Sequence, residues 1–137
     1  MWIVFALLGA LFAAVTGILI KIGIDGVNSN LATAIRTVVV LIMAWGIVFA
    51  MGKHTEIANI TQKSWIFLTL SGIATGASWM FFYRALQMGE ASKVIPIDKL
   101  SVVISVIFAF VILGEEVSMK AIIGVILIAA GTLVMVL

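Results

Sequence analysis

The sequence predicts an all-α integral membrane protein with five transmembrane helices in one domain, residues 1–137. Hydrophobic residues make up 64% of its 137 residues, and the mean hydropathy is +1.34. Soluble domains have about 25% charged residues, whereas only 10% of this chain is charged. Five separate stretches also reach the roughly 20 apolar residues that a helix needs to cross a bilayer. The chain therefore has almost no part outside the membrane.

The composition also excludes several classes of function. The chain has no cysteine, which excludes disulfides and cysteine-based metal sites. Its net charge of +2 comes from scattered residues, without the basic run that binds nucleic acid. The only histidine, His54, lies in a predicted loop, and no pair of carboxylates is placed for acid–base chemistry. We expect no enzyme, no cofactor, no metal and no nucleic-acid partner.

The five predicted helices are joined by short connections with turn and capping residues. The helices are expected at residues 2–22, 31–51, 64–88, 93–113 and 119–137. Asn30 is the expected N-cap of the second helix, and Ser118 that of the fifth. The first stretch lacks a basic n-region and a convincing cleavage site, so we interpret it as a retained helix rather than a signal peptide.

The first helix has a stripe of small residues that ends in a charge. Gly9, Ala13, Gly17 and Lys21 recur at four-residue spacing and share one face. Small residues at this spacing predict a helix-packing face. Lys21 either contacts the substrate or extends to the lipid headgroups, and the sequence leaves both readings open.

The second helix contains Arg36, aligned with the hydroxyl residues Thr33 and Thr37. An arginine inside a span is costly and by default indicates a functional role. We predict that Arg36 faces the bundle interior and binds an anionic group of the substrate. The alternative is a structural arginine bound to carbonyl groups at helix ends.

The third helix is small, polar and aromatic on one half of its circumference and apolar on the other. Since successive residues are about 100° apart, the polar half includes Thr75, Ser78, Trp79 and Tyr83. Aromatic residues in a span often form an interfacial belt. Here they share a face with hydroxyl groups, which favours a cavity lining, and we predict that these four residues contact the substrate.

The fourth helix carries Pro96 and two adjacent charges. Asp98 aligns with Ser101 and is expected to face inward as a proton site or counter-ion, whereas Lys99 is expected to face lipid. Pro96 lacks a backbone donor. It either starts the helix or lies inside it and kinks it beside Asp98, where freed carbonyls would meet a polar substrate. Whether Asp98 pairs with Arg36 stays open.

The fifth helix has no charge after Lys120 and carries a stripe of Gly124, Ile128 and Gly131. A small-residue stripe on such a helix predicts an association surface. We predict that it forms the dimer interface. The helix also resembles the dimerising last helix of the small multidrug resistance proteins, but the first helix lacks the acid that their proton exchange uses.

These motifs together resemble the EamA repeat of the drug/metabolite transporter superfamily. The C-terminal motifs follow in the family's order: Tyr83 with Ala85-Leu86, Ser92 to Pro96, Leu113-Gly114-Glu115, then Gly124 and Gly131. Upstream, Lys21 and Arg36 also match, so the resemblance covers essentially the whole chain. Most relatives carry two repeats in ten helices. This chain has one and is similar to the five-helix bacterial and archaeal branch, whose members pair into a complete transporter.

The basic residues near the ends of the predicted helices do not favour one orientation. Near one side lie Lys21, Arg84 and Lys93, and near the other lie Lys53, Lys63 and Lys120. Because positive charges set orientation, a near-balanced chain can insert both ways. We predict dual topology and an antiparallel homodimer of ten helices. The alternative is a single orientation.

The resemblance implies a transporter in the cytoplasmic membrane of a prokaryote. We expect it to move a small polar or amphipathic metabolite by alternating access. The alternative is a non-transporting membrane subunit, in which Arg36 and Asp98 form a structural pair and the fifth helix docks another membrane protein. The identity of the substrate, its direction and the coupling ion stay open.

Overall fold

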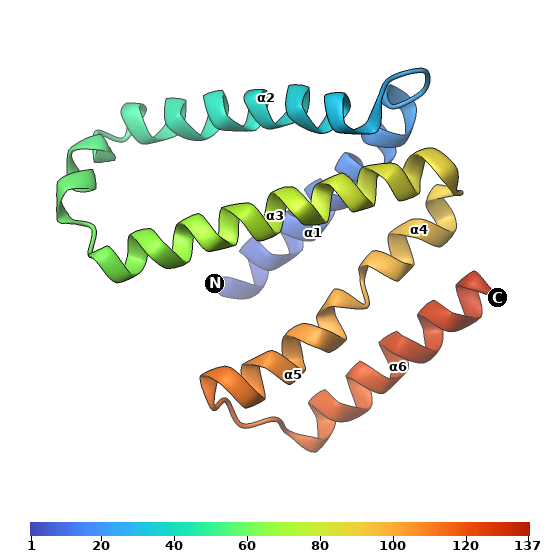
Figure 1. Cartoon of the computed structure of the whole chain (residues 1–137). Helices are drawn as coiled ribbons and strands as arrows, with labels where there is room; N and C mark the ends of the chain where they lie inside the picture. Colours follow the sequence, from blue (N-terminus) through green and yellow to red (C-terminus); the bar gives the residue numbers. More distant parts are fainter. The chain divides into compact units, whose positions relative to one another are not determined.

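The computed structural model describes all 137 residues and is entirely helical (Figure 1). Its elements are α1 (Trp2–Gly23), α2 (Ser29–Ala50), the 3₁₀ helix η1 (Lys53–Asn59), α3 (Gln62–Met88), α4 (Ala91–Asp98), α5 (Ser101–Leu113) and α6 (Met119–Val136). Five segments are long and apolar enough to span a membrane, with α4 and α5 together forming one of them. The prediction of an all-α, multi-pass membrane protein is confirmed.

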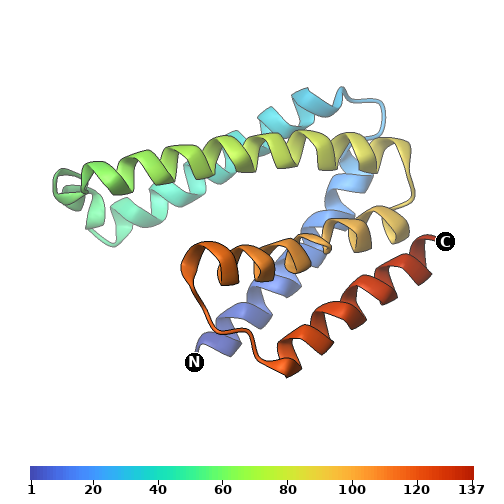
Figure 2. The same cartoon turned by 60° about the horizontal axis from the view of Figure 1, so that its bottom comes forward.

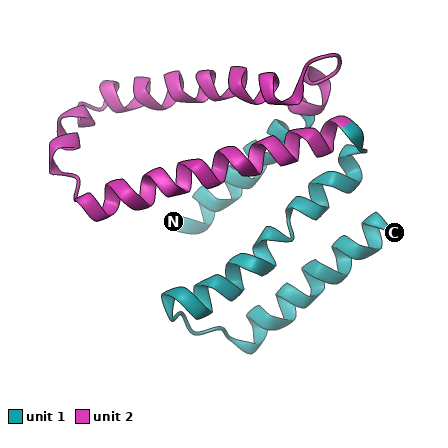
Figure 3. Cartoon of the chain, viewed as in Figure 1, with its two compact units in different colours: residues 1–18, 88–137 teal, residues 19–87 magenta.

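The helices group into two compact units, coloured separately in Figure 3. Residues 19–87 form one, here named the α2–α3 unit, which also contains η1. Residues 1–18 and 88–137 form the other, here named the α4–α6 unit. Only three large apolar side chains are buried, those of Ile24, Tyr83 and Leu86. Lipid tails are as apolar as these side chains, so helices in a bilayer need no protein cover over most of their surface.

Local capping determines where two of the helices begin. The Asn28 side-chain oxygen accepts hydrogen bonds from the backbone N–H groups of Asn30 and Leu31, at 3.0 and 3.2 Å. The N-cap of α2 is therefore Asn28, and the expectation of Asn30 was wrong because the helix begins two residues earlier. The hydroxyl of Ser118 accepts from the N–H of Ala121 at 3.1 Å, which confirms the predicted cap of α6.

The fourth span differs from the single helix expected at residues 93–113. It is interrupted between Asp98 and Ser101, as Figures 1 and 2 show. Pro96 lies inside α4. Its ring nitrogen carries no hydrogen, so the regular helical bond to the carbonyl of Ser92 cannot form. α4 ends two residues later, at Asp98, and α5 begins at Ser101 after two residues that keep helical backbone angles.

The α4–α6 unit is held together along α6, which packs against both α4 and α5 (Figure 2). The Thr132 side chain is 6% exposed, and its hydroxyl lies 2.9 Å from the carbonyl oxygen of Ile128 and 3.4 Å from that of Pro96. Gly17 of α1 is also buried here, because a β-carbon at this position would lie 3.0 Å from the Ile95 side chain. The segment around the proline is thus the contact point of this unit.

Candidate functional site

The α2–α3 unit brings Arg36 onto the aromatic face of α3. The guanidinium carbon of Arg36 lies 4.4 Å from the ring centroid of Trp79 and 5.9 Å from that of Tyr83. Both distances are within the range of about 6 Å for cation–π attraction. Neither carboxylate of this unit, Asp25 or Glu56, forms an ion pair with Arg36. Within this unit, the guanidinium group of Arg36 therefore contacts aromatic rings rather than a carboxylate.

Tyr83 is the most completely buried polar side chain of the chain, at 1% exposure. Its hydroxyl group is buried without a hydrogen-bond partner. Leaving a buried donor unsatisfied costs about 1–3 kcal/mol, so a hydrogen bond to this hydroxyl group would be favourable. A bound water or a polar group of a ligand beside Arg36 would satisfy it.

The hydroxyl residues aligned with this face do not join the cluster. The Thr75 hydroxyl donates to the carbonyl of Ser71 in its own helix at 2.8 Å. Ser78 is exposed. The structure thus brings together Arg36, Trp79 and Tyr83 and leaves Thr75 and Ser78 outside. A role for these two in binding stays a prediction.

Lys21 ties the end of α1 to the end of α3. Its ammonium group donates a hydrogen bond to the backbone carbonyl of Leu86, at 2.5 Å. Leu86 is fully buried, and its carbonyl is among the last four of α3, which have no partner within the helix. Lys21 also lines a polar pocket of about 410 Å³ with Asp25 and Gln87. Lys21 therefore makes a structural contact with Leu86, and its role in substrate binding stays a prediction.

We expect Lys21→Met to lower the melting temperature, because the carbonyl of Leu86 loses a charged donor. Hydrogen bonds to charged groups contribute about 1.5–3 kcal/mol. The measurement is thermal unfolding of purified protein in detergent, with Lys120→Met, an exposed lysine at the start of α6, as the matched control. Equal melting temperatures for both variants would show that the Lys21 contact does not stabilise the fold.

Asp98 lies in the other unit, at the last position of α4. Its carboxylate is 3.6 Å from the ammonium group of Lys99, and the two side chains are 37% and 52% exposed. The sequence placed these side chains on separate faces by counting 100° per residue through a continuous helix. Lys99 and Leu100 keep right-handed helical backbone angles, so the separate faces of Asp98 and Lys99 stay a prediction.

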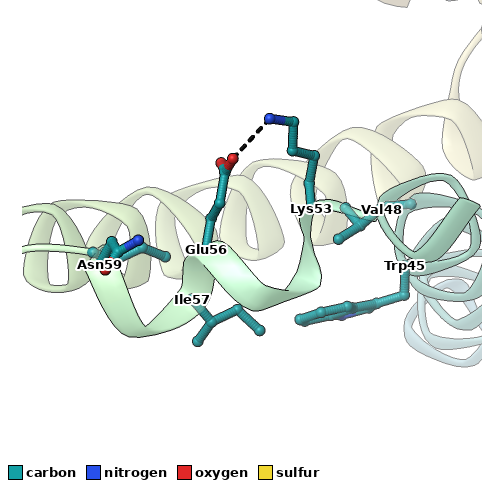
Figure 4. Close-up of a pocket in the computed structure, with 8 residues that line it drawn as sticks. Trp45, Val48, Lys53, Glu56, Ile57 and Asn59 are labelled. Atoms are coloured by element: carbon teal, nitrogen blue, oxygen red, sulfur yellow. Dashed lines mark hydrogen bonds and ion pairs between the residues drawn. The ribbon is translucent and has the colours of Figure 1, made fainter. Parts of the chain in front are cut away.

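A pocket that the sequence analysis missed lies where α2 meets η1. It has a volume of about 600 Å³ and includes the labelled residues of Figure 4: Trp45, Val48, Lys53, Glu56, Ile57 and Asn59. None of the predicted binding residues lines it. Two sequence signals could have indicated it. Trp45 and Phe49 are four residues apart at the end of a span, and Lys53 and Glu56 follow at a spacing of three.

The predicted interface residues of α6 differ in exposure. Gly131 is exposed, and no atom of the chain lies within 4 Å of a β-carbon built on it. Ile128 is 39% exposed, whereas Gly124 is half-buried. Thr132, the neighbour of Gly131, faces Pro96. Gly131 therefore lies on an exposed part of α6.

Comparison with known proteins gives two matches over nearly the full length. The model of the EamA-like transporter family matches residues 1–137. A protein of Sinorhizobium sp named "Uncharacterized transporter in cobO 3'region" is 46% identical over 134 residues, which cover 98% of this chain and 95% of the relative. No solved structure matches the chain significantly.

Proposed function

Because the chain belongs to the EamA-like transporter family, we propose that it carries a small polar or amphipathic metabolite across the cytoplasmic membrane of a prokaryotic cell. Membership of a transporter family indicates transport rather than catalysis. The working unit is an antiparallel homodimer of ten helices. Inverted repeats with binding sites near the bilayer midplane are a common architecture of alternating-access carriers.

The observation that carries this proposal is the cluster of Arg36, Trp79 and Tyr83. A guanidinium group has five N–H donors in a rigid plane that suits carboxylate and phosphate groups. With its face against Trp79 at 4.4 Å and no carboxylate of its unit paired with it, Arg36 can present these donors to an anion. The buried Tyr83 hydroxyl adds a further donor. The substrate would have an anionic group next to an apolar part.

Asp98 and the interruption beside it supply the second part of the proposal. The carboxylate lies where α4 ends, two residues after Pro96. Backbone groups of broken helices line substrate and ion sites in several transporter folds. We assign Asp98 the role of proton site or counter-ion, with Lys99 as its neighbour at 3.6 Å.

The test is solute flux through liposomes that contain only this chain. A specific ligand stabilises the state that it binds, so a thermal-shift screen of purified protein against metabolites first identifies a candidate. Concentrative or counter-flow uptake of that ligand would support a transporter. A ligand that stabilises the protein without crossing the liposome membrane would favour the non-transporting subunit, which docks another membrane protein through α6.

Dual topology predicts that about half of the chains label from outside the cell. The measurement uses an impermeant thiol reagent at saturation on the single-cysteine variants Thr55→Cys in η1 and Asp25→Cys in the first loop. The chain has no native cysteine, so each variant carries one label. One span, α2, separates the two loops, so in any one chain the two cysteines lie on opposite sides of the membrane. One fully labelled and one unlabelled position would establish a single orientation and remove the basis of the antiparallel dimer.

A further inference from the structure

The pocket between α2 and η1 lies where a membrane span ends. The span formed by α2 stops at Ala50. Gly52 then takes a left-handed conformation with φ of 69°, and η1 begins at the next residue. The last turns of a spanning helix and the segment directly after it are at the level of the lipid headgroups. We therefore expect the pocket of about 600 Å³ to lie at the level of the headgroups.

The lining of this pocket has an apolar part and a polar part. Figure 4 shows Trp45 and Ile57 pointing toward each other, with the ion pair of Lys53 and Glu56 apart from them. Trp45 is 43% exposed, and its ring lies tilted against that of Phe49, with the centroids 5.9 Å apart. Tryptophan is enriched at membrane interfaces because one end of it is apolar and the other is polar. The lining matches a ligand that is itself apolar at one end and charged at the other.

The polar part carries one charge of each sign. The ammonium group of Lys53 lies 2.7 Å from the carboxylate of Glu56, and the two side chains are 57% and 59% exposed. Exposed ion pairs contribute little to stability. The two side chains can therefore separate at low cost and take up a ligand with both a negative and a positive group.

We propose that this pocket binds a phospholipid with an ethanolamine headgroup. Lys53 donates to the phosphate, Glu56 accepts a hydrogen bond from the primary ammonium group, and the glycerol and first acyl carbons lie against Trp45 and Val48. A lipid with an anionic headgroup would leave Glu56 facing like charge. A choline headgroup has no N–H to donate to the carboxylate. The proposal concerns a site separate from the Arg36 cluster and does not rest on transport.

The test is native mass spectrometry of the full chain with phosphatidylethanolamine, phosphatidylcholine and phosphatidylglycerol of identical acyl chains. Wild-type protein should retain the ethanolamine lipid with about tenfold preference, the effect of one charge-assisted hydrogen bond. The double variant Lys53→Gln/Glu56→Gln should lose this preference. The matched control, Glu116→Gln/Lys120→Gln in the connection between α5 and α6 and the start of α6, removes one charge of each sign from residues that do not line the pocket. It should keep the preference.

Glu56→Gln alone gives a sharper result, because Lys53 remains. It should shift the preference from phosphatidylethanolamine to phosphatidylglycerol. Equal retention of all three lipids by wild-type protein would overturn the proposal. So would a double variant that keeps the ethanolamine preference, because Lys53 and Glu56 would then not recognise the headgroup. Both residues are exposed, so loss of fold is not expected, and a melting temperature for each variant checks it.

Discussion

Arg36→Gln is expected to reduce solute flux in liposomes by about 10- to 150-fold. A hydrogen bond to a charged group contributes about 1.5–3 kcal/mol, and about 1.4 kcal/mol corresponds to tenfold in affinity. Glutamine keeps the length and polarity of the side chain but removes the charge that lies over Trp79 and Tyr83. The fold should persist, since a charged side chain in a span is costly to insert and its removal lowers that cost.

Two further variants make this result specific. Arg36→Lys keeps the charge but loses the planar guanidinium group with its paired N–H donors, so it should retain only part of the flux. Arg84→Gln is the matched control: Arg84 is an exposed arginine of the same unit, and it donates to the Gln87 side chain at 3.1 Å. Wild-type flux in Arg36→Gln with the identified ligand would exclude the guanidinium as a substrate contact.

Combining Arg36→Gln with Asp98→Asn distinguishes a binding role from a structural pair. An unpaired charge in a span costs about 2.5–3.5 kcal/mol on insertion scales. If the two residues only pair with each other, each single variant strands a charge, and the double variant recovers stability. If they handle substrate, the double variant folds and stays inactive. Melting temperature and flux are measured together on all three variants.

Asp98→Asn should also remove any dependence of flux on a pH gradient, because asparagine cannot release a proton. Lys99→Gln is the control, since it removes the charge 3.6 Å from Asp98 and leaves the carboxylate in place. A pH dependence that survives Asp98→Asn would assign proton coupling to another group.

Gly131→Leu is expected to raise the dissociation constant of the dimer by about 5- to 150-fold. Overpacking a close contact costs about 1–3 kcal/mol, which corresponds to this range. The leucine meets no atom of its own chain within 4 Å of its β-carbon, so the damage should fall on the contact between copies. Single-molecule photobleaching in bilayers, at several protein-to-lipid ratios, measures the dimer fraction.

Gly46→Leu on α2 is the matched control, because this exposed glycine also has nothing within 4 Å of a β-carbon. It should leave dimerisation unchanged. Equal dimer fractions for Gly131→Leu and wild type would place the interface on another helix. A loss of dimer with unchanged thermal stability of the monomer would support α6 as the association surface.

The spans and several local features could be read from the sequence because their causes are local. A stretch of about 20 apolar residues enters the bilayer whatever its neighbours are, so the five spans were predictable to within a few residues. The Ser118 cap depends on one side chain and an N–H three residues later. The faces of α3 follow from helical periodicity, which grouped Trp79 with Tyr83, and Arg36 contacts both rings.

The tertiary structure decided which of these faces meet. The approach of Arg36 to Trp79 and the hydrogen bond from Lys21 to Leu86 join residues far apart in the sequence. Only the structure shows that Pro96 lies inside α4 and that this helix ends at Asp98. Whether a segment leaves water for the membrane depends on the summed hydropathy of its own residues. Contacts depend on how two segments tilt and rotate against each other, and that is set by packing along their whole length.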